Sequence, residues 1–156
     1  AKLLGKEKPP RQVIVVPAKN MPQGVAALTA FDPLAPDVDD LKKAMESQMG
    51  GVQAGEVTQA VRTAEVDGVS VNHGDFIGLR NGKLVVCGES LQEVALELLR
   101  KMDAAKGDMI TIYYGNFVAE AAAQDFAETV RGEYPDQDVE LAYGGQPHYH
   151  FIISVE

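Results

Sequence analysis

The sequence predicts a layered α/β fold with antiparallel β-hairpins in its middle. Three observations lead to this class. Polarity alternates every second residue over 56–87, which is the period of a strand. Apolar residues recur every three to four positions over 90–102 and 118–130, which is the period of a helix. Short apolar runs separate the two helices and end the chain, as buried strands do.

The N-terminal third predicts a strand, a polar loop and two helices. Residues 12–16 (QVIVV) form a β-branched apolar run, typical of a strand buried on both faces. The loop PAKNMPQG (17–24) follows, and VAALTAF (25–31) is expected to be helical. A second helix is expected over 36–49, because proline and three aspartates at its start suit the helix macrodipole. The polar loop residues either meet a ligand at the strand's carboxyl end or cap the helix and face water.

The middle of the chain predicts two hairpins. Asp67-Gly68 and Asn81-Gly82 are pairs that a type I′ turn prefers, because both central residues of that turn need a positive φ. Each pair lies between segments of alternating polarity, so these segments are expected to pair as antiparallel strands. Cys87 ends an apolar run and is expected to pack as a small hydrophobe rather than act as a reactive thiol.

The last third predicts the order helix, strand, helix, strand and strand. A capping box, Ser90-x-x-Glu, starts the first helix. Residues 108–115 (DMITIYYG) have the pattern of a buried parallel strand, and Asn116 is expected to cap the next helix. Two strands, at 139–145 and 148–155, close the chain.

The composition limits the kinds of partner and compartment. The chain has 156 residues, 46% of them hydrophobic, so it can bury one compact core. It carries 14 Lys+Arg and 23 Asp+Glu, a net charge of −9, and has no basic block that would bind nucleic acid or an anionic membrane. The single cysteine permits no internal disulfide, which favours a reducing cytoplasm. No segment reaches the roughly 18 apolar residues of a membrane span, and the first residues lack a signal peptide's apolar region.

The motif QPHYH at 146–150 has two interpretations. His148 and His150 lie two apart on an expected strand, so their side chains point to one face and could hold a metal ion. Zinc needs a third protein ligand, and the neighbour on that face, Gln146, is a poor one. The interpretation that the two histidines lie on the less buried face of a strand and bind no metal is therefore favoured.

No motif predicts a cofactor or a catalytic residue. The phosphate-binding pattern G-x-x-x-x-G-K-[ST] is absent, and the glycine-rich stretch at 50–55 has no lysine and follows a helix instead of a strand. No Ser-His-Asp order or pair of carboxylates stands out either. The expectation is no cofactor, no metal and no catalysis in this chain.

Three segments resemble one known family. VVPAKNMPQGVAALTAFDP (15–33) is similar to VVPTKTIPQGIAAL-AF-P, and GGQPHYHFIISVE (144–156) is similar to GGQPLYYYIISVE. These blocks belong to the fatty acid kinase A proteins, the YloV-like branch of the DAK (dihydroxyacetone kinase-like) superfamily. GEVTQAVRTAEVDGVSVNHGDFIGL (55–79) resembles a third block, and the order and spacing agree over essentially the whole chain.

The resemblance implies that 1–156 is the C-terminal fragment of a longer kinase chain, with a DegV-like or DAK-like fold. The sequence starts on Ala1, in a pattern typical of a helix end, which leads to the same expectation. Sub-lobes are expected at 1–50, 51–88 and 89–156. By resemblance, ATP and magnesium bind an N-terminal domain outside the fragment. The docking partner is FakB, a DegV-like protein that carries the fatty acid whose carboxylate is phosphorylated, and a homodimeric parent protein is compatible with this.

Four polar residues match the family motifs without an evident local need, and they are the candidates for a partner-binding surface: Lys19, Gln23, Arg62 and Gln146. His148 and His150 stand where the family has a hydrophobic residue and a tyrosine, which again favours a strand entry. The leading function is a non-catalytic docking domain of a fatty acid kinase. The alternatives are a stand-alone lipid- or small-molecule-binding α/β domain and, with less support, a dihydroxyacetone-kinase-like or phosphatase activity.

Overall fold

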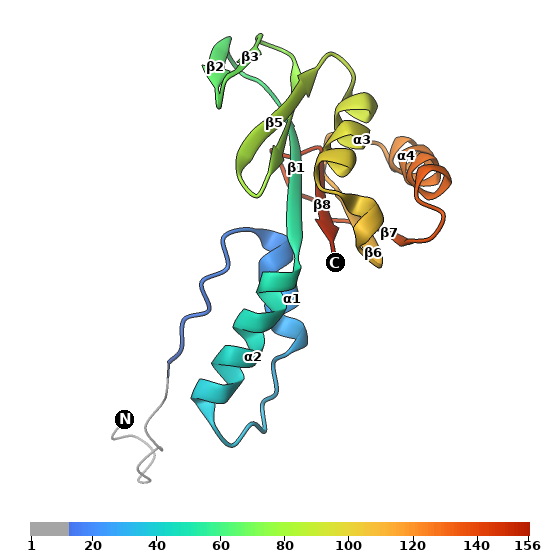
Figure 1. The fold of residues 1–156 in the computed structure, drawn as a ribbon. Coiled ribbons are helices and arrows are strands. Elements are labelled where there is room, and N and C mark those ends of the chain that lie inside the picture. The colour runs from blue at the N-terminus through green and yellow to red at the C-terminus, as the bar shows by residue number, and fades with distance from the viewer. Residues whose placement is uncertain (1–12) are drawn as a thin grey trace, which may run out of the picture. The chain divides into compact units, whose positions relative to one another are not determined.

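A computed structural model describes residues 13–156 of the chain (Figure 1). The described part of the chain divides into two compact units, with the boundary between Gly50 and Gly51. The helix end expected in AKLLGK lies outside the described residues. Two helices form the first unit, and a sheet with its covering helices forms the second.

The first unit contains α1 (Met21–Thr29) and α2 (Val38–Gly51). Helix α1 begins four residues earlier than expected, because the Asn20 side chain caps it by accepting a hydrogen bond from the Gln23 amide at 3.0 Å. Helix α2 was predicted correctly, and its start is capped by the Asp37 carboxylate.

The strand expected over 12–16 is wrong for the four residues that the structure describes. Residues 13–16 have no strand geometry, and the side chains of Val13 and Val15 are 86% and 72% exposed. A β-branched run becomes a strand only when it pairs with a neighbour and buries its side chains, and here it does neither.

The second unit is built on a six-stranded sheet with the order β5-β4-β1-β8-β6-β7. Its strands are β1 (Gln53–Gln59), β4 (Phe76–Arg80), β5 (Lys83–Gly88), β6 (Met109–Tyr114), β7 (Asp138–Tyr143) and β8 (Phe151–Val155). Strands β6 and β7 are parallel, as the buried apolar run predicted, and the other neighbours are antiparallel. Strand β1, from the middle of the chain, pairs directly with the C-terminal strand β8, so the two halves share one sheet.

Both predicted hairpins are confirmed. Strands β2 (Ala64–Val66) and β3 (Val69–Val71) form a two-stranded ribbon joined by Asp67-Gly68, and Asn81-Gly82 joins β4 to β5. All four turn residues have φ between 49° and 80°, as a type I′ turn requires. The Asp67 carboxylate accepts a hydrogen bond from the Leu84 amide at 3.0 Å, which ties the ribbon to the main sheet.

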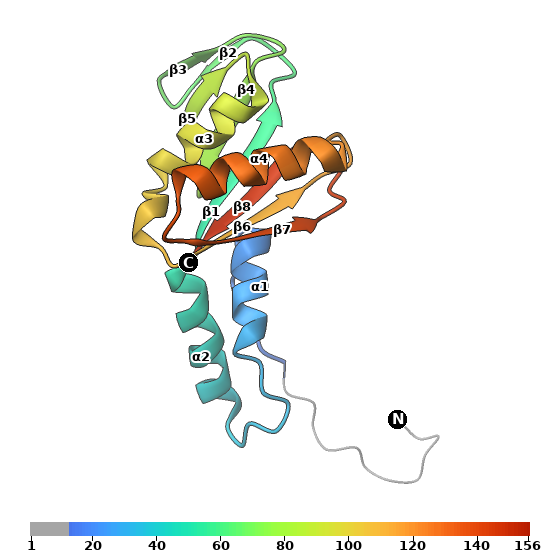
Figure 2. The ribbon, with the colours of Figure 1, turned by 90° about the vertical axis from the view of Figure 1, so that its right-hand side faces the viewer.

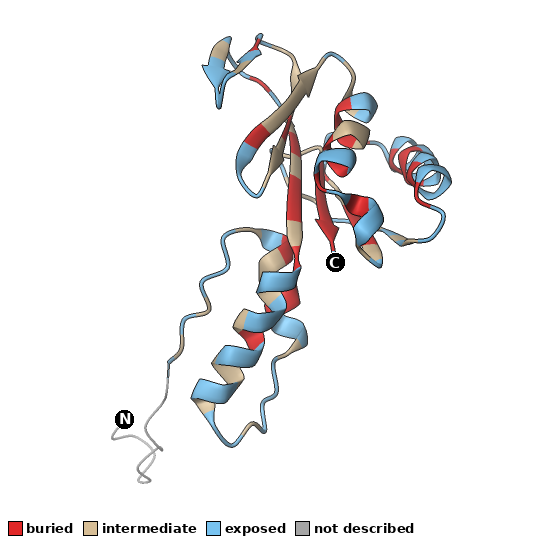
Figure 3. Cartoon of the chain, viewed as in Figure 1, coloured by how far each residue is buried: buried red, intermediate tan, exposed pale blue. Residues whose placement is uncertain are grey.

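Two helices cover the same face of the sheet: α3 (Leu91–Lys101) and α4 (Glu120–Glu133) (Figure 2). Both lie where the periodicity placed them, and Ser90 caps α3 as expected. Their apolar stripes pack on β1, β6 and β8 to form the core, and the buried positions follow these helices and strands (Figure 3). The Phe126 ring stacks on that of Phe151, with centroids 4.7 Å apart. A 3₁₀ turn, Ala104–Lys106, leads from α3 to β6. The expectation for Asn116 is wrong, because Ala119 is the N-cap of α4 and the Asn116 side chain accepts a hydrogen bond from the Tyr143 hydroxyl.

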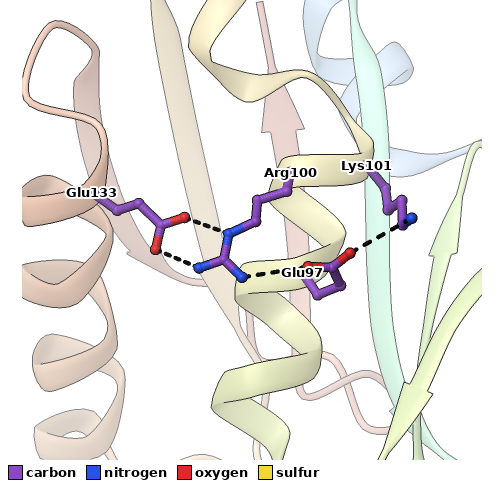
Figure 4. A network of polar contacts seen from close by, with 4 residues as sticks. All are labelled: Glu97, Arg100, Lys101 and Glu133. Atoms are coloured by element: carbon purple, nitrogen blue, oxygen red, sulfur yellow. Dashed lines mark hydrogen bonds and ion pairs between the residues drawn. The ribbon is translucent and has the colours of Figure 1, made fainter.

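An ion-pair network joins the outer sides of these two helices (Figure 4). The Arg100 guanidinium donates from two nitrogens to both carboxylate oxygens of Glu133, at 2.7 and 2.9 Å. Within α3, Glu97 contacts both Arg100 and Lys101. The neighbouring carboxylates raise the pKa of Arg100 above its usual value. The network fixes α3 beside α4.

None of the helices within residues 13–156 has the length and apolar character that a membrane span requires.

Candidate functional site

Exposed apolar side chains of the second unit gather where β1 ends. Among residues 51–156, four large apolar side chains are exposed: Val61 (84%), Val66 (45%), Phe117 (69%) and Tyr143 (65%). The first three line two adjoining hollows, which we call the cleft and the slot. Exposed apolar side chains are ordinary when scattered, but a cluster around a hollow marks a binding surface.

The cleft has a volume of about 470 Å³. Its walls come from the end of β1, the turn after β6 and the loop before β8. It is lined by Thr58, Gln59, Val61, Phe117, Pro147, His148 and His150.

The slot has a volume of about 290 Å³ and lies between the β2–β3 ribbon and the main sheet. It shares Thr58, Gln59 and Val61 with the cleft, so the two hollows form one continuous surface. The remaining lining is apolar except for one cation: Ala60, Arg62, Ala64, Val66, Val71, Ile77, Leu79 and Leu84. A small satellite core of Ala60, Val71 and Leu84 forms the floor.

The loop at 144–150 is held against β6 by backbone hydrogen bonds. The Gly115 amide donates to the His150 carbonyl at 2.9 Å, and the Asn116 amide donates to the Gln146 carbonyl at 3.1 Å. The Thr58 hydroxyl donates to the His148 carbonyl at 2.6 Å from the β1 side. The loop is therefore fixed from both sides, and the cleft is a rigid feature of the unit.

The His150 ring packs between two phenylalanines. Its centroid lies 5.2 Å from that of Phe76, edge to face, and 5.9 Å from that of Phe117. Burial lowers the pKa of His150 below the usual 6.5, and its Nδ1 is buried without a hydrogen-bond partner among the described residues. His150 therefore serves the cleft as a flat, neutral aromatic wall at pH 7.

The expectation that His148 and His150 lie on a strand is wrong, because β8 begins only at Phe151, although both side chains line the cleft. Within residues 13–156, no group of three or more His, Cys, Asp or Glu side chains is arranged to hold a metal ion. The Thr58 hydroxyl is already engaged with a backbone carbonyl.

The structure separates the four predicted partner-binding residues into two pairs. Lys19 and Gln23 belong to the first unit, whereas Arg62 lines the slot and Gln146 precedes the cleft residue Pro147. The idea that all four lack a local need is wrong for the two glutamines. The Gln23 side-chain oxygen Oε1 accepts from the Lys19 backbone amide at 3.0 Å, and the Gln146 side-chain nitrogen Nε2 donates to the Tyr113 backbone carbonyl at 2.9 Å. Both glutamines brace the backbone, and a partner contact for any of the four remains a prediction.

Arg62 differs from the glutamines because its side chain is exposed and makes no ion pair within residues 13–156. Among the described residues that line the cleft and slot there is no carboxylate, although the chain has 23 Asp+Glu. The surface is thus mostly apolar and carries one arginine, on a chain of net charge −9.

Sequence reasoning missed the three apolar residues at the surface. Val61 continues the alternating pattern of residues 56–87, but β1 ends at Gln59, so Val61 leaves the sheet. Phe117 offered a usable signal, since a large aromatic residue stands between a strand and a helix outside the helix's apolar stripe. Val66 is the last residue of β2 before the Asp67-Gly68 turn, and its side chain is exposed because few residues surround the tip of a hairpin.

The solved structures show the same type of fold. The Fak B3 protein of Streptococcus pneumoniae, solved loaded with linoleic acid, is similar with a TM-score of 0.50 and 15% sequence identity over 77% of this chain and 50% of that chain. The α/β class predicted from the sequence is confirmed.

The sequence comparisons identify relatives over nearly the whole chain. Protein YloV of Bacillus subtilis is 34% identical over 145 residues, 93% of this chain and 26% of the relative. An uncharacterized protein of Staphylococcus haemolyticus is also 34% identical, over 92% of this chain and 26% of its own length. The chain therefore spans about a quarter of the length of these relatives. The family model for the C-terminal region of FakA-like fatty acid kinase proteins matches residues 1–156, and the chain belongs to this family.

Proposed function

We propose that this chain is a non-catalytic docking domain of a fatty acid kinase. It receives a DegV-like (FakB) protein that carries a fatty acid and presents it to an ATP- and magnesium-binding domain elsewhere in the parent protein. In that reaction a carboxylate oxygen of the fatty acid takes the γ-phosphoryl group of ATP, which yields an acyl phosphate and ADP. The observation that supports this role is the rigid apolar surface of the cleft and slot on a chain of this family.

The residues of the surface fit docking better than catalysis. Phosphoryl transfer needs groups that hold the nucleotide phosphates and the metal ion. The cleft and slot, as the described residues form them, offer neither carboxylates for magnesium nor a glycine-rich phosphate loop. A domain of this kind contributes by positioning, because holding two reactants in one assembly replaces a bimolecular encounter with an intramolecular step.

Two titrations test the proposal. Calorimetry of the chain with Mg·ATP should give no heat of binding, and a dissociation constant below about 100 μM, roughly −5.5 kcal/mol, would contradict it. Titration with the fatty-acid-loaded DegV-family protein of the same organism should give micromolar affinity, as expected for a transient interface. No binding at about 100 μM partner would refute the docking role.

A second candidate is that the chain itself binds a fatty acid. The fold likeness to the Fak B3 protein, which was solved loaded with linoleic acid, motivates this candidate. Native mass spectrometry with and without added fatty acid distinguishes the two roles. A stoichiometric mass increase with fatty acid alone favours the second candidate, whereas a complex formed only with the partner protein favours docking.

A further inference from the structure

We infer that the slot beneath the β2–β3 ribbon is the anchor point for the partner protein, and that the partner inserts an apolar side chain there with a carboxylate beside it to pair with Arg62. The inference rests on the proposed docking function and specifies the partner's chemistry at one point of the surface.

The slot is large enough, and apolar enough in its lining, to receive an apolar side chain of a partner. Its floor is the satellite core of Ala60, Val71 and Leu84, which the Asp67–Leu84 hydrogen bond holds in place. The walls are aliphatic, and at about 290 Å³ the slot exceeds the space that a single apolar side chain needs. A prepared pocket of this kind is where interface energy concentrates, because the inserted group loses its water without reorganising the receiving protein.

The charge of Arg62 favours a partner that carries a carboxylate beside the inserted apolar side chain. Among the described residues, Arg62 is the only charged one in the lining, and no carboxylate lines the slot to neutralise it. The rest of the chain is strongly acidic, so a partner approaching elsewhere with carboxylates is repelled, and one approaching here is attracted. An arginine can hold a carboxylate with two parallel hydrogen bonds, which also fixes the partner's orientation.

The exposure of the walls favours a protein over a free fatty acid. Val61 is 84% exposed and Val66 is 45% exposed, so one wall stands largely in water and the other nearly half in water. Small-molecule sites typically bury about 70–90% of their ligand, and an acyl chain in this slot would leave much of its length in water. A protein surface covers the slot, both walls and the adjoining Phe117 together.

Two variants with matched controls test the anchor. Ala64→Leu fills the slot from β2 without removing a core side chain, and its control is Ala121→Leu at an exposed position of α4. Arg62→Glu reverses the charge at the slot. Its control, Lys106→Glu, makes the same change of charge two residues before Asp108, whose backbone amide donates to the Glu156 carbonyl at the opposite end of the sheet. Thermal melting confirms that each variant folds before binding is measured with the fatty-acid-loaded DegV-family protein of the same organism.

We expect Ala64→Leu and Arg62→Glu each to weaken binding about tenfold or more, equivalent to about 1.4 kcal/mol, while both controls bind like the parent chain. A further variant, Arg62→Gln, should bind with a weaker dependence on salt than the parent, because it removes one screened charge pair. If the parent binds and the slot variants bind equally well, the anchor is wrong while the docking function stands. If the parent does not bind, both proposals fall. If Ala64→Leu abolishes binding of oleate to the chain but leaves the partner's affinity unchanged, the slot is a lipid site and the inference is overturned.

Discussion

Gly115 is the position where one added carbon atom should disturb the functional surface most. A Cβ built on Gly115 lies 2.2 Å from the Tyr149 carbonyl oxygen and 2.7 Å from the Gln146 carbonyl oxygen. Both are backbone atoms of the loop that forms one wall of the cleft, so no side-chain rotation relieves the clash. The loop must move until the shorter distance grows from 2.2 Å to at least the 3.4 Å of ordinary contact.

The cost of Gly115→Ala follows from that displacement. The movement breaks two hydrogen bonds, from the Gly115 amide to His150 and from the Asn116 amide to Gln146, each worth about 1 kcal/mol. Steric overpacking in a packed site lowers the free energy of unfolding by about 1–3 kcal/mol. Alanine also lowers the entropy of the unfolded chain, which raises the free energy of unfolding by less than about 1 kcal/mol. We expect the free energy of unfolding to fall by about 2–4 kcal/mol, with loss of partner binding because Pro147, His148 and His150 shift with the loop.

Urea denaturation followed by circular dichroism measures this change. The matched control is Gly132→Ala, because Gly132 lies in α4 and a Cβ there meets nothing within 4 Å. Since alanine favours a helix over glycine, this control should raise stability by up to about 1 kcal/mol. If Gly115→Ala unfolds at the same urea concentration as the parent, the loop is not rigid and the reasoning is refuted.

Three further predictions concern single side chains near the same sheet. Gln146→Ala removes the hydrogen bond to the Tyr113 carbonyl and should cost about 1–2 kcal/mol of stability by urea denaturation, whereas an unchanged midpoint would mean that water replaces the amide. Burial raises the pKa of Glu56, which lies between Leu79 and Ile152 on the neighbouring strands. The folded chain therefore holds the Glu56 proton more tightly than the unfolded chain, and this stabilisation of the fold is lost as pH rises above the usual pKa of 4.5. Glu56→Gln should therefore raise stability at pH 7 by up to about 1 kcal/mol and have no such effect at pH 4. Burial lowers the pKa of His150, so the imidazole takes up a proton at a higher pH in the unfolded chain than in the folded chain. The parent chain therefore loses stability as pH falls below about 6.5. His150→Phe should keep the ring contacts and show a shallower loss of melting temperature between pH 7 and 5, and equal slopes would contradict this.

The parts of the fold with strong local signals were predictable from the sequence. The positive-φ pairs Asp67-Gly68 and Asn81-Gly82 encode their turns without help from the rest of the chain, and the Ser90 cap fixes the start of α3. The strand expected over 12–16 failed because a strand is defined by its partner, and no local pattern contains that partner. Pairing of β1 with β8 could not be predicted for the same reason, since these strands are about 100 residues apart in the chain.

The candidate site was predictable only where its residues had a visible role in the sequence. Arg62 and Gln146 were identified from family motifs, but the sequence could not show that Gln146 braces Tyr113 while Arg62 faces the slot. The cleft and slot exist because the β2–β3 ribbon folds onto one edge of the sheet and the 144–150 loop packs on Gly115. Both contacts join distant segments, so the apolar surface that Val61, Val66 and Phe117 form appears only in three dimensions.

The most direct test of the docking role is calorimetric titration of this chain with the DegV-family protein of the same organism, carrying the fatty acid with which it is purified. We predict one-to-one binding with a dissociation constant in the micromolar range, weakened about tenfold by Arg62→Glu and unaffected by Lys106→Glu. Absence of binding at about 100 μM partner, with the chain shown to be folded, would contradict the docking role.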